Sequence, residues 1–163
     1  MSQYYAKAYD MKVIITRMFS HEGKRRGKRF ALSSFAHQIV ENEKGNGDGF
    51  IRHGNLQSVR TYNHIDDAVH AYWLAVDKCD YGEVYNIGGD ETCTVGEALD
   101  KLISKSTISN KLEKLLDQSR IRPTDITLQV PDSTKFREKT GWKPTKALDE
   151  ICDDLLNHWR GAL

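Results

Sequence analysis

Apolar residues recur at helical spacing along much of the chain. The clearest stripe lies within residues 148–159, where apolar side chains are spaced i, i+3, i+4, i+7, i+8 and i+11, and this period predicts an amphipathic helix. Similar stripes within residues 32–40 and 95–103 predict two more helices, the second of which follows a capping box formed by Thr94 and Glu97. Each of these helices needs a partner surface for its apolar face.

Two further helices are expected from local signals. One runs from about Ile65 to Val76, with Asp66 and Asp67 in its first turn, where carboxylates suit the helix dipole. The other is short, covers residues 133–140, and ends at Gly141.

Strand candidates are fewer and lie between the helices. Val13–Thr16 and Glu83–Ile87 are rich in β-branched and apolar residues, and Phe50–His53 is a weaker candidate. The polar, tyrosine-containing segment Gln3–Asp10 is expected to be the tail of a helix that leads into the first strand. Because a complete α/β enzyme normally has several more strand–helix units, we expect an incomplete α/β domain. It would combine one or two parallel strands with a mainly helical lobe and a small strand pair.

Composition and charge narrow the classes of protein. The 163 residues, of which 29% are charged, are expected to form one compact unit, and the formal net charge of +1 provides no global attraction to nucleic acid or membranes. Cys79, Cys93 and Cys152 form no C-x-x-C pair, so neither a disulfide framework nor a zinc site is indicated. The chain has no apolar run of about 20 residues and no signal peptide pattern, and we therefore expect a cytoplasmic protein.

Two glycine-rich segments are candidates for phosphate loops. The run Gly45–Gly49 follows a predicted helix and precedes a strand, the reverse of the order in dinucleotide-binding folds, which favours a surface turn. Gly88 and Gly89 lie between a strand and a helix, but Asp90 and Glu91 follow them and would repel a phosphate. A plain turn is therefore expected there too.

Motifs that carry catalysis are absent from the sequence. There is no G-x-S-x-G, H-E-x-x-H or P-loop pattern. Tyr4 with Lys7 and Tyr9 with Lys12 are three residues apart, whereas the tyrosine–lysine dyad of dehydrogenases requires four. The six histidines have no metal-ligand spacing and are interpreted as solvated or structural. No residue of this chain is assigned a catalytic, cofactor-binding or metal-binding role.

The basic stretch Lys24–Arg29 is the strongest local charge feature. It follows the first strand and precedes a helix, the position at which α/β folds bind ligands, and guanidinium groups bind phosphoryl oxygens in a bidentate manner. A solvated surface loop is the alternative. Nucleic-acid binding is disfavoured, because the stretch lacks interleaved aromatic residues and the chain is not basic overall.

Several short motifs occur in a fixed order from about residue 3 to residue 160. They are Arg17–Glu22, Arg25–Gly27 with Phe30, Gly54–Leu56 with Arg60, His64–Asp67, Glu83–Gly88, Arg122–Asp125, Asp132–Lys135 and Gly141–Pro144. In this order they resemble the C-terminal half of an extended short-chain dehydrogenase/reductase of the NAD-dependent epimerase/dehydratase family. Within it they are most similar to GDP-mannose 4,6-dehydratases and GDP-4-keto-6-deoxymannose reductases.

The resemblance implies a fold and a division of labour. Residues 1–163 would form the sugar-nucleotide-binding portion, with the last strands of a Rossmann-type parallel sheet and a mainly helical substrate-binding lobe. The Rossmann part that binds NADP or NAD, together with the catalytic residues, would lie upstream of this chain. The complete enzyme would then convert GDP-mannose to GDP-4-keto-6-deoxymannose, and the isolated chain would be inactive.

The resemblance also implies roles for individual residues. Arg60 and Arg122 match arginines that hold the diphosphate, with a structural ion pair as the alternative, and Asp125 matches an acceptor of ribose hydroxyl groups. Ser20 stands where the family usually has asparagine, which hydrogen-bonds the sugar nucleotide near the nicotinamide, and serine can also donate and accept but has a shorter side chain.

The remaining roles belong to the nucleoside end of the ligand. The base would be packed and recognised by Asn55 and Leu56, and a loop that closes over the nucleotide would contain Arg25, Arg26 and Phe30.

Alternatives to a dehydratase stay open. Ser33–Ala36 and Glu83–Ile87 look more like the reductase, whereas His21 with Glu22 and Arg25–Gly27 look more like the dehydratase. Another nucleotide-sugar epimerase or dehydratase, or a non-catalytic interaction module, would also fit. In each case exposed apolar faces are expected to produce a homo-oligomer.

Overall fold

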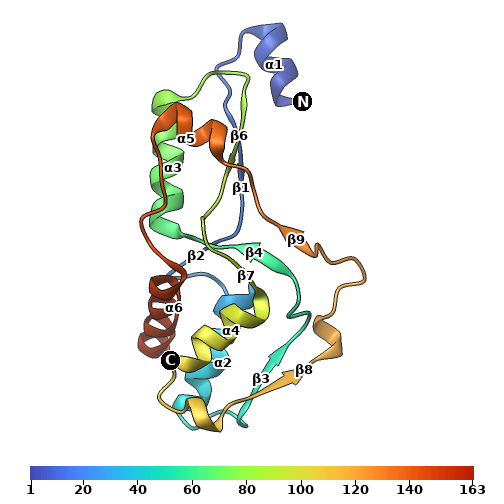
Figure 1. Cartoon of the computed structure of the whole chain (residues 1–163), viewed down its shortest axis with the longest axis vertical. Helices are drawn as coiled ribbons and strands as arrows, with labels where there is room; N and C mark the ends of the chain where they lie inside the picture. The colour runs from blue at the N-terminus through green and yellow to red at the C-terminus, as the bar shows by residue number, and fades with distance from the viewer.

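The computed structural model describes residues 1–163 and contains two hydrophobic cores, which lie at opposite ends of an elongated molecule (Figure 1). The larger core contains 16 buried residues and is built mainly by α2 (Ala31–Glu43), α4 (Val95–Ser104) and α6 (Leu148–Ala162). The smaller core contains 7 buried residues, from α3 (Ile65–Lys78), β6 (Val84–Ile87), α5 (Thr134–Thr140) and their flanks.

The helices of the larger core form where the apolar period predicted them. Each one buries its predicted stripe, for example Leu32, Phe35 and Ile39 of α2 against α6 and α4. The predicted capping box is also confirmed, because Thr94 Oγ1 accepts from the Glu97 amide at 3.0 Å and Glu97 Oε2 accepts from the Thr94 amide at 2.7 Å.

The smaller core packs α3 and α5 against a two-stranded parallel sheet. β1 (Ile15–Met18) pairs with β6 in the register Ile15 to Val84, and α1 (Ser2–Tyr9), which has no buried residue, precedes β1. The helix at the start of the chain and both strands are therefore confirmed. β1 begins two residues later than the strand predicted at Val13, because Val13 instead accepts a backbone hydrogen bond from Gly82.

Short strands are more numerous than predicted. β2 (His21–Glu22) pairs with β5 (Asn63–His64), β3 (Phe50–His53) pairs with β8 (Glu113–Leu116), and β4 (Val59–Thr61) lies between β7 (Thr92–Thr94) and β9 (Leu128–Gln129). Two short 3₁₀ turns, Ser109–Lys111 and Gln118–Arg120, flank β8. The expectation of one small strand pair was wrong, since two to four residues are too few to show an alternating pattern.

The first glycine segment forms a turn, as expected, whereas Gly88 and Gly89 lie in an irregular connection between β6 and β7 rather than in a turn. Gly45–Gly49 joins α2 to β3. Gly89 has an additional role, because a Cβ atom there would collide with the carbonyl oxygen of Tyr62. This glycine lets the chain after β6 approach the segment between β4 and β5 closely. No helix is long and apolar enough to cross a membrane.

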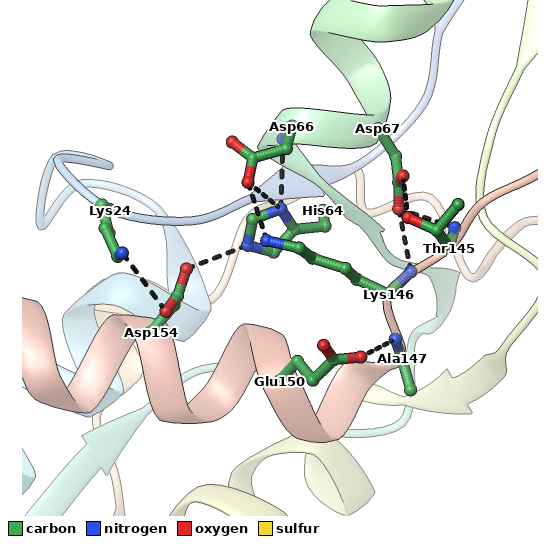
Figure 2. A network of polar contacts seen from close by, with 9 residues as sticks. All are labelled: Lys24, His64, Asp66, Asp67, Thr145, Lys146, Ala147, Glu150 and Asp154. Carbon is green, nitrogen blue, oxygen red and sulfur yellow. Dashed lines mark hydrogen bonds and ion pairs between the residues drawn. The ribbon is translucent and has the colours of Figure 1, made fainter.

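A polar network joins the N-terminus of α3 to the C-terminal part of the chain (Figure 2). Asp67 is buried and accepts hydrogen bonds from the Thr145 amide at 3.0 Å, the Thr145 hydroxyl at 2.7 Å and the Lys146 amide at 3.1 Å. Asp66 is exposed and binds only Lys146 Nζ from that segment. The two carboxylates that sequence placed together in the first turn therefore have different roles.

His64 belongs to the same network and is structural, as expected. It is the N-cap of α3, and its Nδ1 accepts from the Asp66 amide at 3.1 Å. The proton therefore lies on Nε2, which donates to Asp154 of α6 at 3.0 Å. Lys24 lies 3.6 Å from the same carboxylate, so the loop after β2 is joined to α6 as well.

Replacing Asp67 tests how much this junction stabilises the fold. We expect Asp67→Ala to lower the free energy of unfolding by about 2 to 3 kcal/mol, because it removes three hydrogen bonds between a buried carboxylate and the segment at Thr145 and Lys146. The matched change Asp66→Ala should cost less than about 1 kcal/mol, since its ion pair is exposed. Urea unfolding measures the free energy of unfolding of both variants, and equal losses would contradict the different roles of the two carboxylates.

Candidate functional site

A cleft of about 690 Å³ lies beside the larger core. One part of its lining comes from the segment that runs through β2 into α2, and the rest comes from the β3–β4 region and from residues 119–129. Seven of the residues assigned to substrate binding from sequence line it: Ser20, Arg26, Phe30, Asn55, Arg60, Arg122 and Asp125. Residues that are far apart in the sequence thus contribute to one cleft.

The other two assigned residues lie elsewhere. Leu56 lines a smaller adjoining cavity of about 390 Å³, together with Asn55, Arg122 and Asp125. Arg25 lines neither cavity. It is exposed and has a positive φ of 65°.

The cleft is strongly basic although the chain is nearly neutral. Two carboxylates, Glu22 and Asp125, are part of its lining. Six basic side chains also line it: Arg26, Lys28, Arg29, Arg60, Arg120 and Arg122. A cleft with such an excess of positive charge concentrates anionic ligands.

Asp125 lies at the centre of a hydrogen-bond cluster in the cleft. Its Oδ2 accepts from the Ser58 hydroxyl at 2.9 Å and from Asn55 Nδ2 at 3.0 Å, and its Oδ1 lies 3.6 Å from Arg60 Nη2. The pKa of Asp125 lies below its usual range. The main cause is the hydrogen bond from Ser58, and the hydrogen bond from Asn55 and the charge of Arg60 contribute as well. Asp125 is therefore ionised at neutral pH, and its Oδ1 lies on the side of Arg60.

The three arginines on this side of the cleft differ in their partners. Arg60 has the ion pair with Asp125 that was the alternative to diphosphate binding, and it also donates to the Val59 carbonyl oxygen at 2.8 Å. Arg120 is held by Asp117 at 3.0 Å. Arg122 is exposed and makes no hydrogen bond or ion pair within the chain, so all of its donors are available to a ligand.

On the opposite side, Arg26 is ordered by its own loop. Its guanidinium carbon lies 3.4 Å from the ring centroid of Phe30, a cation–π arrangement, and its carbonyl oxygen accepts from the Ser33 hydroxyl at 2.5 Å. These contacts position Arg26 and Phe30 together at the edge of the cleft.

Glu22 and Tyr62 line the cleft but were not assigned to the site from sequence. Glu22 is only 5% exposed, and burial raises its pKa to about 7, an effect that the charge of Arg26 partly offsets. Burial also raises the pKa of Tyr62. The burial of Glu22 depends on the pairing of β2 with β5, residues 63–64, which no local pattern indicates.

The sequence profile of the GDP-mannose 4,6 dehydratase family matches residues 1–155. The chain belongs to this family.

Individual relatives in the family are distant. The human GDP-mannose 4,6 dehydratase is 26% identical over 94% of this chain, which covers 45% of that protein. The GDP-6-deoxy-D-mannose reductase of Pseudomonas aeruginosa is 23% identical, and the match covers 93% of this chain and 49% of that protein. The chain thus spans about half the length of these relatives.

The fold is shared as well. The structure of RMD from Pseudomonas aeruginosa complexed with NADPH superposes with a TM-score of 0.88 at 21% identity, over 99% of this chain and 53% of that one. The prediction of a C-terminal part of an extended short-chain dehydrogenase/reductase of the epimerase/dehydratase family is confirmed.

The burial of Glu22 has a consequence for stability. Its pKa is about 7 in the folded chain against an ordinary value of 4.5, so the folded chain binds an additional proton between these values and stability falls as pH rises through them. Between about pH 5 and about pH 8, we expect the free energy of unfolding of the wild type to fall by roughly 2 kcal/mol more than that of Glu22→Gln, which has no carboxyl group to titrate at this position. Urea unfolding at both pH values measures this, and parallel losses would argue against a buried carboxylate.

Proposed function

We propose that this chain is the nucleotide-sugar-binding portion of a GDP-mannose 4,6-dehydratase-like enzyme, which converts GDP-mannose to GDP-4-keto-6-deoxymannose. The observation that carries the proposal is the basic cleft in which Arg60, Arg122 and Asp125 meet. Family membership supports the substrate class.

The geometry of the cleft supports a role for each of these groups. Arg122 has no partner within the chain and can form bidentate bonds to a diphosphate, and Arg60 lines the same cleft. Asp125 is oriented through Oδ2 by Ser58 and Asn55, which leaves Oδ1 to accept from ribose hydroxyl groups. The adjoining cavity at Asn55 and Leu56 would take the base.

The nicotinamide cofactor of the family would be held mainly by residues outside this chain. Its pyrophosphate requires glycines with open backbone amides between a strand and a helix. Gly88 and Gly89 follow β6, but Pro131 and Tyr62 pack closely against them, and Gly45–Gly49 precedes a strand. These segments do not fit the group, and we expect the isolated chain to bind substrate without converting it.

A GDP-4-keto-6-deoxymannose reductase is the second candidate. The Pseudomonas aeruginosa reductase matches 93% of this chain, nearly the same share as the 94% matched by the human dehydratase. Both enzymes would use the same cleft for the GDP moiety, so the assignments above hold for either activity.

Calorimetric titration with GDP-mannose, GDP and UDP-glucose tests the proposal. We expect the GDP ligands to bind more tightly than UDP-glucose, and Arg122→Ala to weaken GDP binding by roughly 1.5 kcal/mol or more, about tenfold, through loss of charged hydrogen bonds. Arg17→Ala is the matched control, because Arg17 is an exposed arginine on β1 that does not line the cleft. Equal effects of the two variants, or no preference for GDP, would contradict the proposed function.

We also propose that the chain self-associates. Val69, Trp73 and Val76 form an apolar stripe on the outer face of α3 and are 60%, 74% and 76% exposed.

Light scattering against the calculated 18.6 kDa tests this proposal. We expect a multiple of that mass, and Trp73→Lys should shift the distribution towards the monomer, because a charge would be buried in the contact. Tyr81→Lys, a change at an exposed aromatic residue outside α3, is the control. A wild type that stays monomeric at all concentrations would exclude the interface.

A further inference from the structure

Glu22 is a buried carboxyl group with an unused oxygen. Its Oε2 makes no hydrogen bond, and the nearest cation is Arg26, whose Nε lies 3.6 Å away and also has no hydrogen-bond partner. Both residues line the cleft. A buried carboxylate without hydrogen bonds is costly, and native structures retain such groups chiefly where a ligand or water supplies the missing partner.

The position of Glu22 along the cleft follows from the strand pairing. β4 and β5 follow each other with only Tyr62 between them, and Glu22 pairs with His64 of β5. Arg60 of β4 and Tyr62, which lies between β4 and β5, also line the cleft. Four extended residues span at most about 13 Å, which is the upper limit for the distance between the backbones of Arg60 and His64, the strand partner of Glu22.

The order of groups along the cleft matches the order of groups in a sugar nucleotide. The smaller cavity, proposed above for the base, is lined by Asn55, Leu56, Arg122 and Asp125, and Arg60 Nη2 lies 3.6 Å from Asp125 Oδ1. If the diphosphate binds at Arg60, the next group of the ligand, the hexose, extends towards Tyr62 and Glu22. A hexose presents adjacent hydroxyl groups, which are the donors that a carboxylate accepts.

We propose that Glu22 is a specificity-determining residue that recognises the hexose, accepting hydrogen bonds from its hydroxyl groups while Arg26 balances the charge. This inference rests on the proposed function. It assigns to Glu22 a contact that contributes to binding of the sugar but not of the nucleoside diphosphate. A purely structural Glu22–Arg26 pair would affect both ligands alike.

The test compares GDP with GDP-mannose by calorimetry at about pH 8, where Glu22 is ionised. The quantity measured is the ratio of the two dissociation constants, which reports the contribution of the hexose. Glu22→Gln keeps the shape of the side chain but removes its charge, and Glu22→Asp keeps the charge but withdraws it by one methylene. Glu138→Gln, at an exposed glutamate on α5, is the matched control.

We expect both Glu22 variants to bind GDP as the wild type does and to lose most of the preference for GDP-mannose, about fivefold to tenfold. Glu138→Gln should leave the ratio unchanged. An unchanged ratio in Glu22 variants that still bind GDP would overturn the inference and leave the proposed function standing. A wild type that binds GDP-mannose no more tightly than GDP would overturn it too, and a chain that does not bind GDP would overturn both proposals.

Discussion

The arrangement of the two cores depends on the polar contacts of residues 62–67. His64 bonds to α6 through Asp154, and Asp67 holds the segment that leads into α6. Gly89 allows the chain after β6 to lie directly against the backbone of Tyr62. Because the same segment contains β5, which pairs with β2, these contacts also set the distance between the two sides of the cleft.

Sequence predicted the helices well because their information is local. The stripe on α6 needs only its own residues, and the capping box of α4 needs only Thr94 and Glu97. The role of Asp67 could not be predicted in this way. It resembles any first-turn carboxylate until folding brings Thr145, 78 residues later, within 3.0 Å. The short strands were missed for the same reason, since pairs such as β4 and β9 are defined by distant partners.

The candidate site was predictable to the extent that it follows motifs. The ordered motifs placed Arg60, Asn55, Arg122 and Asp125 in one site, and the structure brings these residues to one cleft. The motifs could not distinguish Arg26 from its neighbour Arg25. The structure separates them, because Arg26 lines the cleft and stacks on Phe30, whereas Arg25 is exposed and lines neither cavity.

The distribution of charge in the cleft supports a ligand with alternating chemistry. A site for an anion alone would gain nothing from carboxylates, which weaken its attraction for phosphate. Yet Asp125 is held ionised beside Arg60, and Glu22 is kept buried beyond Tyr62 at the other end. Carboxylates on both sides of an arginine suit hydroxyl groups on both sides of a phosphate. A nucleoside diphosphate sugar has this order, with ribose and hexose on either side of the diphosphate, whereas a free mononucleotide has a sugar on only one side of its phosphates.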